Sequence, residues 1–224
     1  RRYLLDEGIK PETIIKIGSM LPEVIKNNFE AIENSKILKN LKLKKDKYFL
    51  VSIHREENVD SEDNFQDFLE TIEVLTDVYE LPIVISTHPR TAKRIEEINY
   101  KPKDGLVKFC KPFGYFDYNK LQMNSLCVIS DSGTIAEESS ILKLSSITIR
   151  QAHERPEASD EATFIMSGLK KDSVLEAIRL VTSYKKALGI NSIKDYMNEN
   201  TSLKVLRTIL SYTHYVNRTV WKKP

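Results

Sequence analysis

The sequence has 224 residues, of which 41% are hydrophobic, enough to form the core of one large domain or of one and a half ordinary domains. The net charge of +2 argues against general binding to nucleic acid or to a membrane surface, so any anion is expected to be bound locally. No hydrophobic run approaches the roughly 20 residues of a membrane helix. The two cysteines form no disulfide framework or CxxC motif, so a reducing, cytoplasmic setting is expected.

The opening segment, RRYLLDEGIK, has the character of a helix that stops at Gly8, so we expect the sequence to begin inside a larger protein. From there, short hydrophobic runs alternate with stretches of helical periodicity, which is typical of parallel βαβ units. A charged, helix-like segment at 21–47 follows the first run, and we interpret it as a crossing between domains. The predicted strands are 13–18, 48–53, 82–86, 106–109, 126–130 and 146–150.

The clearest predicted helix lies between the second and third of these strands. Its hydrophobic residues recur at helical spacing, which predicts one stripe that packs on the sheet, and Ser61 is placed to cap the N-terminus. The stripe consists of Phe65, Phe68, Leu69, Ile72 and Leu75. After Gly168 the pattern becomes helical again and predicts two closing helices, at 172–188 and 202–220.

Polar clusters follow four of the predicted strands. They read SIHREEN, STHPRT, SDSGTIAEE and IRQAHERPE. In open parallel sheets, ligands bind at the carboxyl ends of the strands, where loops lead into helix N-termini whose free N–H groups attract anions. Any one polar loop is unremarkable, but four in these positions favour a binding site along this edge of the sheet.

The loop SDSGTIAEE has two interpretations. In the first, the residues are purely structural: Ser132 and Thr134 cap the next helix, and Glu137 and Glu138 are favourable charges in its first turns. Alternatively, Gly133 allows a phosphate to approach, Ser132 and nearby amides donate to it, and one carboxylate reaches a ribose diol. The glycine favours the second interpretation, although the loop is not a complete GxGxxG dinucleotide motif.

The other clusters differ in how strongly they indicate function. His54 beside Arg55 places a polarisable donor next to a fixed cation, which suits phosphate. His88 precedes a proline and an arginine, and local capping or pairing explains it more simply than ligand binding. Arg155, flanked by glutamates, can belong to an ion-paired loop. Neither an HExxH motif nor a cysteine cluster occurs, so no metal site is expected, and no cofactor is required.

The segments IHREEN, THPRT, DSGTIAEES and ERPE, in this order, resemble the C-terminal half of the non-hydrolysing UDP-N-acetylglucosamine 2-epimerase family. The resemblance covers nearly the whole chain. It implies an α/β fold of the glycosyltransferase-B type, in which two Rossmann-like domains face each other across a cleft, with most of the N-terminal domain absent from this sequence. The implied divisions are 1–20, the end of the N-terminal domain; 21–47, the crossing; 48–200, the UDP-binding domain; and 201–224, a closing helix.

The resemblance also implies roles for individual residues. His54 and Arg55 would lie near the diphosphate and serve as catalytic residues of this half of the fold. Ser132 and Gly133 would donate hydrogen bonds to phosphate. Glu138 would bind the ribose.

Three further positions complete the implied UDP-binding set. Tyr118 matches an aromatic position near the uracil, and Thr134 and Arg155 belong to the same binding loops. The sequence departs from the commonest family pattern here: Thr134 replaces a glycine, Ala136 replaces a glutamine and His153 stands where threonine is common. The backbone freedom of glycine is therefore lost at residue 134.

The motifs DSGTI, HERPEA and KPFG, with the tail SYTHYVNRTVWKK, resemble most the branch that epimerises UDP-2-acetamido-2,6-dideoxy-L-talose at C2. The product would be UDP-N-acetyl-L-fucosamine for capsule or O-antigen. The implied mechanism is anti elimination of UDP to a 2-acetamidoglycal, followed by readdition. A UDP-N-acetylglucosamine 2-epimerase, a glycosyltransferase-B type UDP-sugar transferase and a non-catalytic binding module remain alternatives.

The expected partners follow from the same resemblance. A UDP-sugar is the substrate, neither nucleic acid nor membrane is bound, and a homodimer is possible. In the family, the carboxylates that deprotonate C2 come mainly from the N-terminal domain. This chain alone is therefore expected to bind UDP without turnover.

Overall fold

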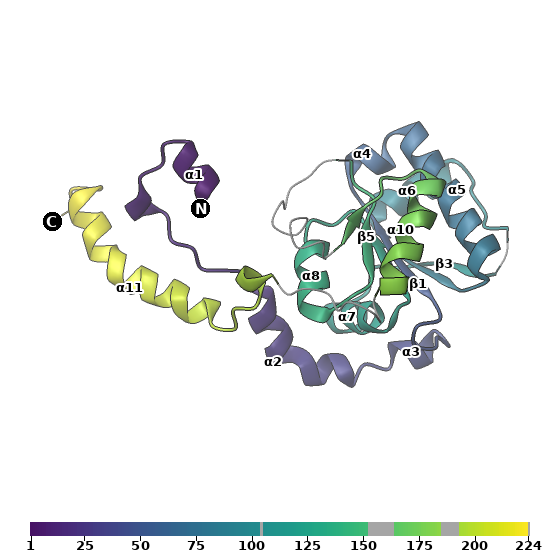
Figure 1. Ribbon diagram of the computed structural model, residues 1–224, viewed down its shortest axis with the longest axis horizontal. Coiled ribbons are helices and arrows are strands. Elements are labelled where there is room, and N and C mark those ends of the chain that lie inside the picture. The colour runs from purple at the N-terminus through teal and green to yellow at the C-terminus, as the bar shows by residue number, and fades with distance from the viewer. Residues whose placement is uncertain (104, 152–163, 185–192, 224) are drawn as a thin grey trace. The chain divides into compact units, whose positions relative to one another are not determined.

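The computed structural model describes residues 1–103, 105–151, 164–184 and 193–223 (Figure 1). The chain divides into two compact units, one made of Arg1–Asn27 with Lys194–Pro224 and the other of Asn28–Ile193. Among the described residues, no helix combines the length and the hydrophobicity that crossing a membrane would require.

The larger unit is built on a parallel sheet of six strands in the order β3-β2-β1-β4-β5-β6. The strands are β1 Phe49–Ile53, β2 Ile83–Thr87, β3 Val107–Cys110, β4 Cys127–Ser130, β5 Ser146–Thr148 and β6 Ile165–Met166. Strands β1 and β4 are buried along almost their whole length, as expected for central strands covered on both faces.

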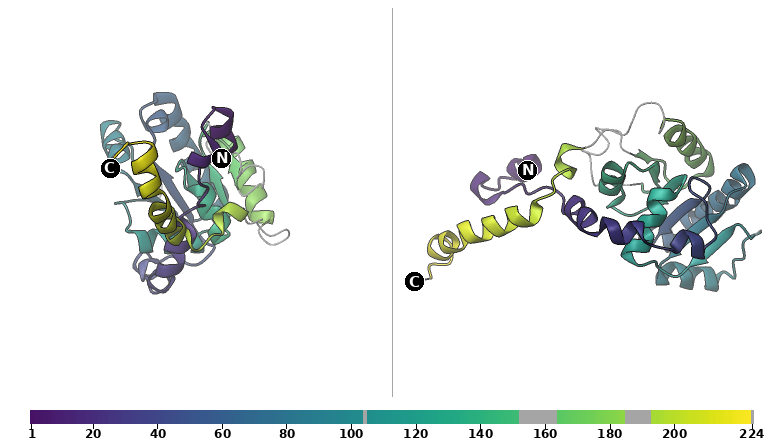
Figure 2. Two further views of the ribbon diagram at one scale, coloured as in Figure 1. Left: turned by 90° about the vertical axis from the view of Figure 1, so that its left-hand side faces the viewer. Right: turned by 90° about the horizontal axis from the view of Figure 1, so that it is seen from below.

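Helices cover both faces of this sheet (Figures 1 and 2). Helices α5 and α10 pack on one face, and α3, α7 and α8 pack on the other. The described helices of the unit are α3 Ile37–Asn40, α4 Glu56–Val59, α5 Glu62–Tyr79, α6 Pro89–Glu97, α7 Tyr115–Asn124, α8 Ile135–Leu142 and α10 Lys171–Tyr184, and the second half of α2 Leu21–Glu33 also belongs to it.

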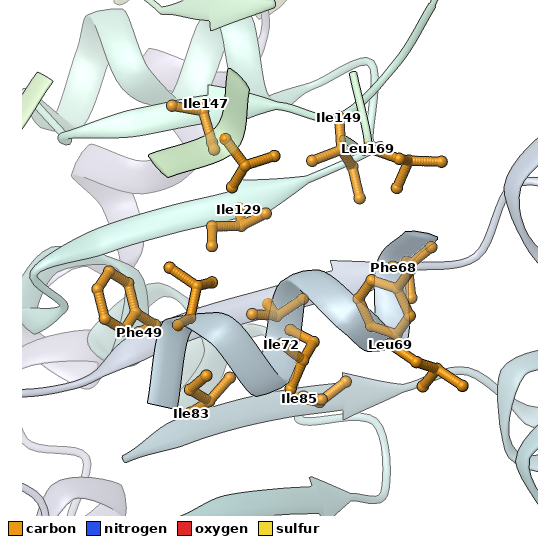
Figure 3. Packing of buried hydrophobic residues seen from close by; sticks show 14 of the residues in the cluster. Phe49, Phe68, Leu69, Ile72, Ile83, Ile85, Ile129, Ile147, Ile149 and Leu169 are labelled. Carbon is orange, nitrogen blue, oxygen red and sulfur yellow. The ribbon is translucent and has the colours of Figure 1, made fainter. Parts of the chain in front are cut away.

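The main core lies between the sheet and helix α5 (Figure 3). The predicted stripe of α5 is buried, and it meets side chains of β1, β2, β4 and β5, including Ile85, Ile129 and Ile147. Ser61 caps this helix by accepting a hydrogen bond from the N–H of Asn64 at 3.3 Å. Both sequence-based predictions for the helix are confirmed.

The smaller unit contains α1 Arg2–Asp6, the 3₁₀ turns Pro11–Thr13 and Lys194–Tyr196, and α11 Thr201–Thr219. Its two chain segments are joined by polar contacts. Lys16 Nζ lies 2.5 Å from Asp195 Oδ2, and the side-chain amide of Asn198 donates to the carbonyl of Ile17 at 2.8 Å.

Five of the six predicted strands are confirmed, and the strand predicted at 13–18 is wrong. Pro11 begins a 3₁₀ turn there, and the carbonyl of Ile17 accepts from a side chain rather than from a neighbouring strand. Strand β6 was not predicted, because a strand of two residues is too short to show alternation. The closing helices correspond to α10 and α11, and the part of the first beyond Tyr184 lies outside the described residues.

The strand order determines where a ligand can bind. From β1 the chain moves outward to β2 and β3, and it then returns to the centre at β4 before moving outward the other way. The carboxyl ends of β1 and β4 are therefore the topological switch point, where loops leave in opposite directions and open a crevice.

Candidate functional site

The loops that follow β1 and β4 meet at this switch point. His54 and Arg55 come directly after β1, and Asp131 to Thr134 come directly after β4. Ser52 and Ser130 are paired in the sheet, so the residues that follow them emerge side by side. Two of the four predicted polar clusters, those after β1 and β4, are thus brought side by side. Most of the fourth, which follows β5, lies outside the described residues.

Asp131 is the residue that joins the two loops. It is fully buried, and its Oδ1 lies 2.9 Å from His54 Nδ1. The carboxylate also accepts from the backbone N–H groups of His54 at 3.0 Å and Arg55 at 2.9 Å, and from Asn58 Nδ2 at 3.2 Å. In return, Arg55 Nε donates to the backbone carbonyl of Asp131 at 2.9 Å.

These contacts set the charge states of the pair. Burial acts to raise the pKa of Asp131, but the hydrogen bonds from His54 and Arg55 outweigh it and hold that pKa below its usual value. The hydrogen bond to Asp131 raises the pKa of His54 above its usual value, against the opposing effect of partial burial. The arrangement therefore favours a buried carboxylate paired with an imidazolium.

A hollow of about 450 Å³ opens beside this pair, lined by His54, Arg55, Glu56, Glu57, His88 and Arg90. His88 caps helix α6, because its Nδ1 accepts from the N–H of Arg90 at 3.3 Å, and its ring centroid lies 6.1 Å from that of His54. Arg90 binds Glu56 Oε1 at 2.8 Å and Asp60 Oδ2 at 3.0 Å. Local capping and pairing thus account for His88 and Arg90, as the sequence suggested.

The loop after Asp131 forms a chain of hydroxyl groups. Ser132 Oγ lies 2.9 Å from Thr134 Oγ1, and the hydroxyl of Thr134 donates in turn to the carboxylate of Glu138. Thr134 precedes α8 but makes no side-chain cap to it, so the capping-only interpretation of this residue is wrong. The threonine that replaces the usual glycine is instead a hydrogen-bond donor to Glu138.

Glu138 also accepts from Gln122 Nε2 at 2.7 Å, and Gln122 is only 1% exposed. Burial raises the pKa of Glu138, and the hydrogen bonds from Gln122 and Thr134 oppose that rise without cancelling it. Tyr118 lies close by: its ring packs against the cluster around Tyr48 and Leu121, and its hydroxyl contacts Ser52 and Gln122. Two residues of α7, Tyr118 and Gln122, therefore lie beside Glu138, and Gln122 fixes the orientation of its carboxylate.

Of the predicted site residues, His54 and Arg55 line the hollow. His54 and Arg55 are hydrogen-bonded to Asp131, and Ser132, Thr134 and Glu138 form a second hydrogen-bonded group. Arg155 lies outside the described residues. Their roles toward a ligand stay predictions, as do those of Gly133 and Tyr118.

Sequence reasoning missed Asp131, Asn58 and Gln122. The signal for Asp131 was its place directly after a buried central strand, next to the glycine loop. Asn58 and Gln122 gave no comparable signal, because each lies in a helix where polar residues are common.

An α/β domain with a parallel sheet in this strand order belongs to the class of Rossmann-like folds. The family model for UDP-N-acetylglucosamine 2-epimerase matches residues 1–210, and the chain belongs to that family. The expected α/β fold and the family resemblance are confirmed, while the L-fucosamine branch stays a prediction.

Known proteins agree with this assignment. A structure of UDP-N-acetylglucosamine 2-epimerase from Rickettsia bellii is 42% identical, with a TM-score of 0.88 over 99% of this chain and 60% of that one. The Methanocaldococcus jannaschii UDP-N-acetylglucosamine 2-epimerase is 32% identical over 96% of this chain and 59% of its own length. A crystal structure of the M. jannaschii enzyme with UDP-GlcNAc and UDP has a TM-score of 0.83 over 94% of this chain and 58% of that one. The chain thus spans about three fifths of these relatives.

Proposed function

We propose that the protein containing this chain epimerises C2 of a UDP-2-acetamido sugar, and that this chain supplies the UDP-binding half of the site. The observation that carries the proposal is the meeting of His54, Arg55 and Asp131 at the switch point of the sheet. The complex of the M. jannaschii relative with UDP-GlcNAc and UDP supports the substrate class. Nucleotide binding at this edge is also what the fold favours.

The proposed chemistry is elimination of UDP followed by its readdition. When the C1–O bond breaks, negative charge develops on the β-phosphate, and donors already fixed in place stabilise it. Arg55 and a protonated His54 would face that charge, with Ser132 and the amide of Gly133 as further donors. Removing one such donor from a comparable site costs about 3 kcal/mol of transition-state stabilisation.

Glu138 is proposed to bind the ribose hydroxyls. The carboxylate is an acceptor held in one orientation by Gln122 and Thr134, which suits a vicinal diol. Tyr118 is proposed to border the uracil, with its hydroxyl engaged by Ser52 and Gln122. The C2 base is not assigned to this chain.

For the sugar itself, the motifs favour UDP-2-acetamido-2,6-dideoxy-L-talose, with UDP-N-acetyl-L-fucosamine as product, and UDP-N-acetylglucosamine is the alternative. The proposed setting is the cytoplasm, consistent with Cys110 and Cys127 being outside any disulfide, and the proposed role is supply of a sugar for capsule or O-antigen.

Turnover in D2O tests the reaction. The full-length protein, given either UDP-sugar without added NAD or metal, is expected to place deuterium at C2 of the product, because C2 is deprotonated and reprotonated. The 6-deoxy-L-talo substrate is expected to react at least about tenfold faster by kcat/KM. Product without deuterium at C2 would overturn the epimerase proposal. Transfer of the sugar to an acceptor with release of UDP would favour a glycosyltransferase.

Substitution of Arg55 tests the site independently of the sugar. Arg55→Ala is expected to lower kcat by about 100-fold, since it removes a donor to the leaving group. Lys93→Ala, which removes a charge whose side chain is 79% exposed on α6, is the matched control and is expected to leave kcat unchanged. Equal activity of the two variants would contradict the placement of UDP at this crevice.

A further inference from the structure

The proposed chemistry gives Asp131 no contact with the ligand, yet its buried carboxylate joins the loops after β1 and β4. Its carboxylate is 0% exposed and receives donors from three residues: His54, through both Nδ1 and the backbone, Arg55 and Asn58. A buried charge of this kind is costly unless its lone pairs are satisfied, and here they are. Joining two loops does not by itself require a buried charge, so a second role of this carboxylate is expected at its contact with His54.

The geometry at His54 indicates that role. Because Nδ1 contacts Asp131 Oδ1 at 2.9 Å, Nδ1 carries a proton and Nε2 is the nitrogen that a ligand in the hollow would meet. In a neutral ring Nε2 can only accept a hydrogen bond, which an anion cannot use. When the ring is protonated, Nε2 becomes a charged donor.

We propose that Asp131 is a positioning residue that holds His54 with Nδ1 toward the carboxylate, so that the ring binds the UDP diphosphate through a protonated Nε2 and binding is coupled to uptake of that proton. The inference rests on the proposed function, since it takes the diphosphate as the ligand. It adds to that function a dependence on pH and a residue that produces it.

The other charged groups around the ring leave Asp131 as the main source of this bias. Arg55, on the same loop, disfavours the protonated ring, and Glu57, on α4, favours it. On α6, His88 is 6.1 Å away between ring centroids, and Arg90 is paired with carboxylates of Glu56 and Asp60. The pKa of His54 is raised chiefly by the hydrogen bond to Asp131.

Replacing Asp131 by asparagine keeps the size and removes the charge. The amide offers one acceptor oxygen and one NH2 group, so either His54 Nδ1–H or the backbone N–H groups of His54 and Arg55 face a donor. The doubly protonated form of the His54 ring is then no longer stabilised by the carboxylate of Asp131, so the pKa of His54 should fall. Asp67→Asn is the matched control, because Asp67 is also a carboxylate with a low exposed fraction, 19%, and it pairs with Lys170 on the surface of the larger unit.

The first measurement needs no ligand. The imidazole signals of the 224-residue chain are followed by NMR from pH 5 to 9, with His54 assigned by its loss in His54→Gln. We expect the His54 midpoint of the wild type and of Asp67→Asn to lie above that of Asp131→Asn. Identical midpoints in wild type and Asp131→Asn would overturn the proposal.

The second measurement is UDP affinity by calorimetry over the same pH range. The terminal phosphate of UDP titrates near pH 6, so every profile is compared with that of His54→Gln, which cannot take up the proton. Relative to this reference, we expect wild-type affinity to fall by about tenfold as pH rises through the His54 midpoint, because a charge-assisted hydrogen bond is lost. In Asp131→Asn the same fall in affinity should occur at lower pH. When the Asp131→Asn sample is acidified, its UDP affinity should rise to that of the wild type.

The outcomes separate the two proposals. If Asp131→Asn weakens UDP binding equally at every pH, the residue only shapes the loop and the positioning role fails. If the wild-type profile coincides with that of His54→Gln, the coupling fails even where Asp131→Asn does not fold. If UDP does not bind the wild type while the NMR midpoints still differ, the diphosphate site of the proposed function is overturned, and the hold of Asp131 on His54 stands.

Discussion

Gln122 donates its side-chain N–H to Glu138 Oε2 at 2.7 Å, which holds that carboxylate in one orientation. Gln122 lies on α7 and Glu138 on α8, so two helices that pack on the same face of the sheet are joined by one polar contact. Burial raises the pKa of Glu138, which means that its ionised form carries a cost in the folded state at neutral pH.

Glu138→Gln is expected to separate stability from binding. The substitution removes the buried charge, so the melting temperature at pH 7 should be equal to or above that of the wild type. UDP affinity should fall by about tenfold, because a neutral amide is a weaker acceptor for the ribose hydroxyls. Thermal melting and calorimetry check the two effects, with the surface variant Glu70→Gln as control. A lower melting temperature with unchanged UDP affinity would indicate a purely structural carboxylate.

The His54–Asp131 pair predicts how stability depends on pH. Asp131 has a lowered pKa in the fold, so its contribution is present above its ordinary pKa of 3.8 and is lost as pH falls through the folded value. His54 has a raised pKa, so its contribution is complete below its ordinary 6.5 and is lost as pH rises through the folded value. The pair should therefore contribute most between about pH 4 and 6.5.

Urea denaturation across pH 3 to 9 measures this dependence. The difference in unfolding free energy between wild type and His54→Gln should be largest in that window and should shrink on both sides of it. A difference that stays constant across the range would mean that folding does not shift the pKa values of His54 and Asp131 in the way stated here.

Two positions on α5 test the core. Ile72 is 1% exposed within the main cluster, whereas Val78 is 48% exposed on the same helix. Ile72→Ala should cost about 2–5 kcal/mol of unfolding free energy, because it removes buried methyl groups and leaves a cavity. Val78→Ala should change it by less than about 0.5 kcal/mol. Similar urea midpoints for the two variants would contradict the packing shown in Figure 3.

The parts of the fold that the sequence predicts are those with a local pattern. Strands β1 and β4 are continuous hydrophobic runs, and the stripe of α5 repeats at helical spacing, so their burial can be inferred within a few residues. The segment 13–18 carries the same kind of pattern, yet it forms no strand: it begins in a 3₁₀ turn, and the carbonyl of Ile17 accepts from the side chain of Asn198. Which groups satisfy a backbone carbonyl is a tertiary property.

The site divides in the same way. His54, Arg55 and the 132–134 loop are predictable, because polar residues directly after parallel strands mark the ligand-binding edge. The bond between Asp131 and His54 spans 77 residues, and only the strand order brings the two ends together. The burial of Asp131, and hence its effect on the charge of His54, could be found only once β4 was seen to lie beside β1.

The two ring nitrogens of His88 allow its role as a helix cap to be tested separately from a role in binding UDP. Its Nδ1 caps α6 by accepting from the N–H of Arg90, and the ring lines the hollow beside His54. Because Nδ1 is the acceptor, the proton of the neutral ring lies on Nε2, which is then available to donate to an anion. Capping and binding thus use different nitrogens and can be removed one at a time.

His88→Ala removes both functions, and His88→Asn restores only the cap, since asparagine is among the best capping residues. We expect His88→Ala to lose about 1 kcal/mol of unfolding free energy and His88→Asn to lose little. If Nε2 donates to the diphosphate, both variants should bind UDP about fivefold to tenfold more weakly than the wild type, because a neutral hydrogen bond contributes about 1 kcal/mol. Wild-type affinity in His88→Asn would instead restrict His88 to its cap and leave His54 as the imidazole that binds UDP.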